Sequence, residues 1–240
     1  MSRAFTETEQ GATLIDPELV DGIVAKTDLL REQDAARVRI ISRRAFASIL
    51  TKPERRLVKR LYRLSPQRVG IDMDEWTKTP DPDESEFALL PAAVHTIGGI
   101  ERLIQAQYIP PVAYDAFRDL QGAMRHDGLG ILSGSSYRSP AYQAGIFLTH
   151  TRRLDYNFDD TLKAVALPMN SEHSDLEHPA FDVIAKNIPA EHHSYNDFEK
   201  TPEFAWMVAH AALFGFALSY PEGNDTGLVF EPWHWRFIGK

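Results

Sequence analysis

The pattern of apolar and polar positions predicts helices in the first part of the chain. One helix is expected to begin at Asp16-Pro17-Glu18, where the aspartate caps the first turn and proline fits its first position. A second begins at Thr51, because Thr51 and Glu54 form a capping box and apolar residues follow at spacings of three and four. Residues 17–64 are therefore predicted to be mainly helical.

The middle of the chain is predicted to contain further helices and a strand. The helices are expected at 91–108, 111–126 and 139–153, and the strand at 128–133. The helix at 111–126 has the clearest apolar face, built from Val112, Phe117, Leu120 and Met124. Gly98-Gly99 weakens the pattern over 91–108.

Short strands dominate the predictions for the last part of the chain. Apart from a helix at 202–213, strands are expected at 181–184, 216–219, 228–230 and 233–238. Because helices precede a cluster of strands, the predicted fold class is α+β.

A length of 240 residues, of which 43% are hydrophobic, is enough for one large domain or two small ones. The segment 71–90 is acidic and contains Pro80 and Pro82, which neither a helix nor a central strand accepts. We therefore expect a helical N-terminal region at 1–70, a loop at 71–90 and a second domain at 91–240.

The chain contains no cysteine, which excludes disulfides, thiolate catalysis and cysteine-ligated metals. Any metal site must use His, Asp and Glu. The net charge of −8 argues against a protein dedicated to nucleic-acid binding. No secretory signal is visible at the N-terminus, which by sequence favours the cytoplasm, and the most apolar segment, 204–220, is shorter than the roughly 20 residues of a membrane-spanning helix.

Residues 31–68 carry twelve Lys and Arg against three acidic residues, within a chain that is acidic as a whole. Such a run is most often the solvated face of helices. The alternative is peripheral contact with an anionic surface, such as lipid headgroups or a cell-wall polymer.

Three segments carry the residue types that chemistry needs: SGSSYRSPAYQ, SEHSDLEHPAFDV and EPWHWRF. The second and third combine histidine with carboxylates, a donor set that suits zinc. The first places Arg138 where a strand gives way to a helix, and arginine offers a planar fork to a carboxylate or an oxyanion.

Together these segments resemble the zinc-dependent D-alanyl-D-alanine carboxypeptidase and dipeptidase family, which includes vancomycin-resistance-type D,D-carboxypeptidases and L-alanyl-D-glutamate endolysins. The resemblance covers about 91–239. The matching residues are Ser136, Tyr137, Arg138, Ser139 and Gln143 in the first segment, Ser171, His173, Ala180 and Asp182 in the second, and Glu231, Trp233 and His234 in the third.

The resemblance implies a zinc ion held by His173, Asp182 and His234, with Glu231 as the general base. It also implies that Arg138 stabilises the oxyanion or binds a terminal carboxylate, with Gln143 and Ser136 contributing to substrate binding. The implied fold is a small antiparallel sheet with helices on one side and zinc on its open face. Because side chains alternate along a strand, Glu231 must precede the strand of His234 if the two are to converge.

The implied substrate is a peptidoglycan stem peptide in the cell envelope, and release of C-terminal D-Ala is the favoured reaction. Dipeptidase, L,D-carboxypeptidase and endopeptidase action remain open within the family. Outside it, the rivals are a binding module that recognises wall peptide without cutting it and a cytoplasmic metallopeptidase or amidohydrolase.

The middle segment departs from the family pattern in one respect. His173 and Asp182 are nine positions apart where the family has seven, and His178 occupies the position of the family's glycine. A two-residue insertion around Asp175-Leu176 is the simplest explanation, since a loop can absorb it. The alternatives are that His178 replaces His173 as a ligand or that the site is degenerate and binds no metal.

Overall fold

The computed structural model describes residues 4–8, 13–64, 81, 84–189, 195–224 and 229–239. It groups the chain into two compact units, each built from two stretches: Met1–Pro82 with Arg138–Ser174, and Asp83–Tyr137 with Asp175–Lys240. Of the predicted loop at 71–90, residues 71–80, 82 and 83 lie outside the described residues. The predicted domain limits 1–70, 71–90 and 91–240 stay a prediction, because the units reflect packing alone.

The first unit is mainly helical. Its elements are β1 (Phe5–Glu7), β2 (Thr13–Ile15), α1 (Pro17–Gln33), a 3₁₀ turn at Arg37–Ile40, α2 (Arg43–Ile49), α3 (Lys52–Leu61), α5 (Pro140–Arg153), α6 (Phe158–Ala164) and a 3₁₀ turn at Glu172–Ser174. Both predicted caps are present: Asp16 accepts the backbone N–H of Glu18, and Thr51 and Glu54 make the two reciprocal bonds of a capping box.

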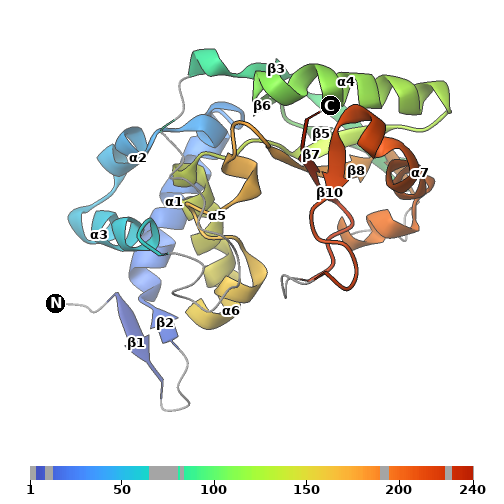
Figure 1. The fold of residues 1–240 in the computed structure, drawn as a ribbon. Coiled ribbons are helices and arrows are strands. Elements are labelled where there is room, and N and C mark those ends of the chain that lie inside the picture. The colour runs from blue at the N-terminus through green and yellow to red at the C-terminus, as the bar shows by residue number, and fades with distance from the viewer. Residues whose placement is uncertain are drawn as a thin grey trace. The chain divides into compact units, whose positions relative to one another are not determined.

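Helices α1 and α5 lie side by side in this unit (Figure 1). Their buried residues share one apolar core, to which α1 contributes Ile23 and Val24 and α5 contributes Phe147 and Leu148. The N-terminal helices therefore pack directly on a segment that belongs to the predicted peptidase region. The two helices approach so closely that a Cβ on Gly145 would lie 2.6 Å from the Thr27 side chain.

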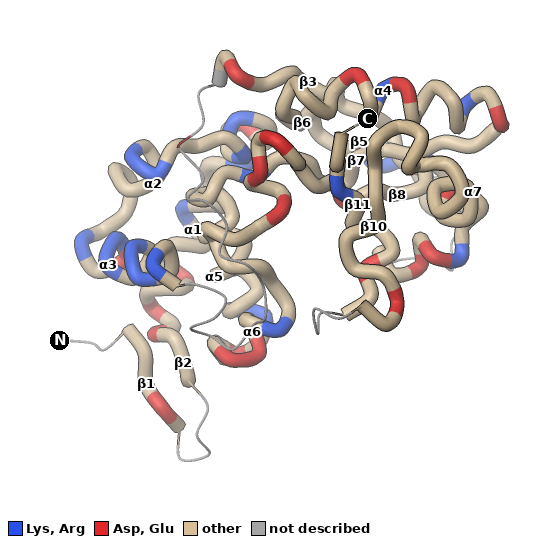
Figure 2. Tube along the Cα trace, in the orientation of Figure 1, with Lys and Arg blue, Asp and Glu red and all other residues tan. Residues whose placement is uncertain are grey.

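Helix α3 is rich in basic residues (Figure 2), and these residues are exposed. Leu57, Val58 and Leu61 are buried, whereas Arg56 and Lys59 are exposed. This is the amphipathic arrangement expected of a solvated helix face. Contact of residues 31–68 with an anionic surface stays a prediction.

The second unit contains strands and helices. Its elements are a 3₁₀ turn at Glu84–Glu86, β3 (Ala88–Leu90), β4 (Ala93–Ile97), β5 (Ile100–Ile104), β6 (Gln107–Ile109), α4 (Pro111–His126), β7 (Ile131–Ser135), β8 (Ala180–Ala185), β9 (Asn187–Ile188), a 3₁₀ turn at Tyr195–Lys200, α7 (Pro202–His210), a 3₁₀ turn at Ala211–Phe214, β10 (Phe216–Leu218) and β11 (His234–Phe237). The main sheet has four strands in the order β10-β11-β8-β7, and all its pairs are antiparallel.

Helix α4 covers one face of this sheet (Figure 1). Phe117 of α4 stacks on Phe181 of β8, with ring centroids 4.9 Å apart. Since side chains alternate along a strand, Asp182 points to the opposite face. The predicted α+β class with a small antiparallel sheet and helices is confirmed.

The helix predicted over 91–108 is wrong, because this segment forms β4, β5 and the start of β6. Gly98 and Gly99 adopt positive φ angles of 56° and 81° and connect β4 to β5, with Ile97 paired to Ile100 across the turn. Glycine adopts positive φ without steric cost, and the favoured two-residue hairpin turn needs it at both positions.

The strand predicted over 228–230 is not found in the part of the chain that the structure describes. Residue 228 lies outside that part, and Val229 and Phe230 belong to no strand. No helix among the described residues is long and apolar enough to cross a membrane.

Candidate metal centre and active site

Strand register places Asp182 and His234 opposite each other. They are direct partners in the antiparallel pair of β8 and β11, and both are buried. The Nδ1 atom of His234 lies 3.1 Å from Oδ1 of Asp182. Their separation is set by backbone hydrogen bonds of the sheet, so the pair is held in place without help from a loop.

Glu231 lies in the turn before β11, and its side chain is next to His234. Strand β11 begins at His234, and the backbone N–H of His234 donates to the carbonyl oxygen of Glu231 at 3.1 Å. The Oε2 atom of Glu231 lies 3.8 Å from Nδ1 of His234, and 27% of its side chain is exposed. Glu231 thus precedes the strand, as alternation required, and its carboxylate is both next to His234 and partly open to solvent.

His173 lies in the 3₁₀ turn Glu172–Ser174, next to the segment that carries Arg138. The backbone N–H of Arg138 donates to the carbonyl oxygen of His173 at 3.0 Å. The hydroxyl of Ser174 donates to the carbonyl oxygen of Arg138 at 2.6 Å. These two bonds tie the arginine of the first predicted segment to the histidine of the second.

Among the described residues, His173, Asp182 and His234 form a group suited to a metal ion. Each offers one ligand atom, these atoms lie within 4.8 Å of one another, and all three residues are buried. His178 is outside this group: 46% of its side chain is exposed, and its Nδ1 lies 3.9 Å from Oδ2 of Asp175. The group contains His173 and not His178, and the binding of a metal by its three residues stays a prediction.

The two extra positions between His173 and Asp182 are accommodated in a compact turn. Oδ1 of Asp175 accepts the backbone N–H groups of Glu177 and His178, each at 2.9 Å. Arg236 of β11 contacts both ends of this turn. Its Nη2 donates to Oδ2 of Asp175 at 2.7 Å, and its Nε donates to the carbonyl oxygen of His178 at 3.1 Å. An expanded loop is thus compatible with an ordered site.

Ser136 and Gln143 are both in the interior. Ser136 is fully buried, and its backbone N–H donates to Oε1 of Gln107 at 2.8 Å. Gln143 is 1% exposed, and its Nε2 donates to the carbonyl oxygen of Ala166 at 3.0 Å. These hydrogen bonds fix Ser136, which precedes Arg138, and Gln143, which follows it.

Sequence reasoning missed Gln107 because its segment was predicted to be helical. Its amide bridges two parts of the chain, since Nε2 donates to the carbonyl oxygen of Ser133 at 2.9 Å while Oε1 accepts from Ser136. No local sequence signal marked this residue, because Gln107 is polar and yet buried in β6, whereas the aromatic Tyr108 beside it is less buried.

Two aromatic contacts near the predicted ligands were also missed. The ring of Tyr220 lies 5.2 Å from the ring of His234, and that of Tyr195 lies 6.0 Å from that of Trp233. Tyr195 and Trp233 are distant in the sequence, so no local pattern connected them.

The electrostatic influence of Arg138 reaches helix α5. Burial lowers the pKa of His150, and the positive charges of Arg153 and Arg138 lower it further. His150 is therefore kept neutral at lower pH than an exposed histidine. It is half-buried in the first unit and does not belong to the metal group.

Comparison with known proteins gives a consistent result. The family described as "VanY: D-alanyl-D-alanine carboxypeptidase" matches residues 106–240. YodJ of Bacillus subtilis (strain 168), named as a candidate carboxypeptidase, is 31% identical over 143 residues, which are 58% of this chain and 50% of that protein. A D-alanyl-D-alanine carboxypeptidase of Enterococcus faecalis (strain ATCC 700802 / V583) is 27% identical over 172 residues, 65% of this chain and 60% of that enzyme.

The solved structure of the LdcB LD-carboxypeptidase is also similar. It matches with a TM-score of 0.52 and 28% identity, over 67% of this chain and 71% of that one. The chain spans half to three-fifths of the length of the two relatives named above. The family match covers more than half of the chain and includes every residue of the candidate site, and the chain therefore belongs to the VanY family of D-alanyl-D-alanine carboxypeptidases.

Proposed function

We propose that this chain is a zinc-dependent peptidase that releases C-terminal D-Ala from peptidoglycan stem peptides. The observation that carries the proposal is the buried group of His173, Asp182 and His234 with the carboxylate of Glu231 3.8 Å from His234. The membership of the VanY family and the named activities of the relatives support the same reaction class.

The residues present fit a zinc ion. Two imidazoles and one carboxylate are typical zinc donors, and three protein ligands leave a coordination position open, as catalytic sites require. In this account His173, Asp182 and His234 hold the metal. When bound in such a site, Zn²⁺ polarises a carbonyl group and lowers the pKa of water to about 7.

Glu231 acts as the general base in this account. Its carboxylate accepts a proton from the attacking water and then delivers that proton to the amine of the departing D-Ala. The turn that precedes β11 supports this role, because it leaves the side chain partly exposed beside a buried ligand.

Arg138 binds the terminal carboxylate of the substrate or the oxyanion that forms at the scissile carbonyl. Its planar guanidinium suits either group. The bonds from its backbone to His173 and Ser174 fix its position relative to a metal ligand. Ser136 and Gln143, predicted to contribute to substrate binding, are proposed to do so by holding this segment.

A second candidate function is L,D-carboxypeptidase action, favoured by the similarity to LdcB. The two reactions differ in the residue that precedes the departing D-Ala. Comparison of a peptide ending in D-Ala-D-Ala with one that has an L-residue before its terminal D-Ala separates them: the proposed function predicts faster release from the first.

The test of the catalytic assignment is Glu231→Gln, which keeps the size of the side chain and removes the base. We expect zinc content to be unchanged and D-Ala release to fall about 1,000-fold, within the range for loss of a general base. Glu222→Gln, on an exposed turn, is the matched control and should be fully active. Full activity of Glu231→Gln would overturn the assignment. A wild type that binds the peptide and never cleaves it would establish the binding-module alternative.

A further inference from the structure

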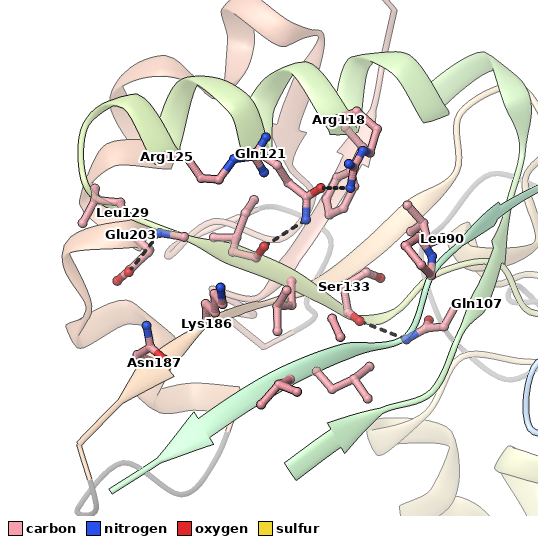
Figure 3. A pocket seen from close by; sticks show the side chains of 18 of the residues that line it. Leu90, Gln107, Arg118, Gln121, Arg125, Leu129, Ser133, Lys186, Asn187 and Glu203 are labelled. Atoms are coloured by element: carbon pink, nitrogen blue, oxygen red, sulfur yellow. Dashed lines mark hydrogen bonds between the residues drawn. The ribbon is translucent and has the colours of Figure 1, made fainter. Parts of the chain in front are cut away.

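The second unit contains a cavity of about 630 Å³ that the proposed reaction does not use (Figure 3). It is lined by α4, by β7 and by the short strands next to them. Ile131 and Ser133 face it from β7, where they pair with Ala185 and Val183 of β8. These positions share the face that α4 covers, whereas Asp182 points to the opposite face. The cavity is therefore separate from the metal group.

The floor of the cavity is polar and buried. Gln121 donates from Nε2 to the carbonyl oxygen of Ile131 at 3.0 Å, and its Oε1 accepts from Nη1 of Arg118 at 3.2 Å. Ser133 is 8% exposed, and its buried Oγ has no hydrogen-bond partner. A buried hydroxyl without a partner is costly to the fold. A ligand that offers an oxygen at this point would relieve that cost.

Positive charge surrounds this floor. The charged lining residues are Arg118, Arg125 and Lys186 against the single carboxylate of Glu203, an excess of two positive charges. Figure 3 shows Arg118 and Arg125 projecting from α4, with Lys186 beside β7. In the described part of the chain, neither Arg125 nor Lys186 forms an ion pair.

We propose that this cavity binds a dicarboxylate ligand of about dipeptide size. Two carboxylates balance the excess charge, and guanidinium groups bind carboxylates through paired hydrogen bonds. Apolar residues such as Leu90 and Leu129 offer contact to the carbon skeleton between the charged groups. The volume lies within the roughly 300–1,000 Å³ usual for small-molecule sites.

Gln107 connects this cavity to the segment before Arg138. It lines the cavity, donates to the carbonyl oxygen of Ser133, and accepts the backbone N–H of Ser136. A ligand on the floor of the cavity would therefore contact residues bonded directly to that segment.

The experiment is calorimetric titration of the 240-residue zinc-loaded protein with N-acetylated Ala-Glu, which carries two carboxylates and no ammonium group that would offset their charge. N-acetylated Ala-Gln, which carries one carboxylate, and inorganic phosphate are the comparison probes. We expect Ala-Glu to bind about tenfold more tightly than Ala-Gln, the difference that one charge-assisted contact typically makes. Binding of phosphate alone, or no binding of Ala-Glu at 10 mM, would overturn the proposal.

Two variants locate the site. Arg125→Gln combined with Lys186→Gln should weaken Ala-Glu binding at least tenfold and leave D-Ala release unchanged, while Arg56→Gln on the exposed side of α3 should change neither. Ser133→Ala should weaken binding without lowering the melting temperature, because the hydroxyl has no partner in the fold. Unaltered Ala-Glu binding by the double variant would show that the dipeptide binds elsewhere and would refute the site.

Discussion

Arg236 connects the sheet to the expanded loop that follows His173. Its guanidinium contacts both Asp175 and the carbonyl oxygen of His178, while its backbone lies in β11 two residues after His234. The loop is thereby fixed to the strand that carries a proposed ligand. Groups that orient metal ligands from outside typically influence metal affinity by a factor of 10 to 100.

Replacement of Arg236 by Gln should weaken zinc binding about tenfold, because the turn at Asp175 loses its outer contact. The turnover rate at saturating zinc should change less than about threefold, since Arg236 is assigned no chemical step. Competition with a chromophoric chelator gives the affinity, and Arg102→Gln on exposed β5 is the control. Wild-type zinc affinity in Arg236→Gln would show that the loop needs no such support.

At the scale of elements, the contact of α1 with α5 depends on a glycine. A Cβ on Gly145 would lie 2.6 Å from Cγ2 and 2.8 Å from Oγ1 of Thr27, and Thr27 is fully buried. The side chain of Thr27 is also fixed by a hydrogen bond to the carbonyl oxygen of Ile23 at 2.9 Å. It cannot move aside without loss of that bond, so the helices would have to separate.

We therefore expect Gly145→Ala to lower the free energy of unfolding by about 1–3 kcal/mol, the usual cost of overpacking. Gly122→Ala in α4 is the matched control, because its Cβ would meet only Nη2 of Arg125 at 3.7 Å. That control should gain about 0.5–1 kcal/mol from helix propensity. Chemical denaturation measures both, and equal effects of the two substitutions would contradict the close contact.

Helices with end signals were predictable, whereas the β4–β5 hairpin was not. The helix at 111–126 was predicted at its observed limits, since a proline at its start and one continuous apolar face agree. In 91–108 the apolar residues Val94, Ile97 and Ile104 also fit helical spacing, although they belong to two strands. In a short segment the spacing of apolar residues cannot distinguish a helix from a strand. The positive φ angles of Gly98 and Gly99 decided the outcome.

At the scale of the whole molecule, the sequence indicated the family and the segments that carry the candidate site, but not the packing around them. The three motif segments resemble the family that the comparison shows, and the ligand roles of His173, Asp182 and His234 stay a prediction. No local pattern reports which helices share a core. The packing of α1 on α5 and the bridge made by Gln107 both join residues distant in sequence, so they emerged only from the structure.

Low pH should lower the free energy of unfolding of the helical unit, because Glu54 becomes protonated. Burial alone would raise the pKa of Glu54, but hydrogen bonds from Lys26 and Thr51 outweigh it and hold the pKa below its ordinary value of 4.5. The folded state therefore binds fewer protons than the unfolded one. The resulting stabilisation is present above about pH 4.5 and is lost as the pH falls through the folded-state value.

Glu54→Gln should consequently cost about 1–2 kcal/mol of unfolding free energy at pH 7, and this difference should be smaller at pH 3. Urea denaturation of both proteins at the two pH values measures it. A difference that stays constant with pH would mean that the charge of Glu54 contributes nothing to stability.

We propose that one zinc ion, held by His173, Asp182 and His234, enables release of D-Ala. The most direct measurement is titration of metal-free protein with Zn²⁺ while D-Ala release from a peptide ending in D-Ala-D-Ala is recorded. We predict activity that rises from zero and reaches a plateau at about one zinc per chain. Absence of D-Ala release at every zinc concentration, or full release before any zinc is added, would contradict it.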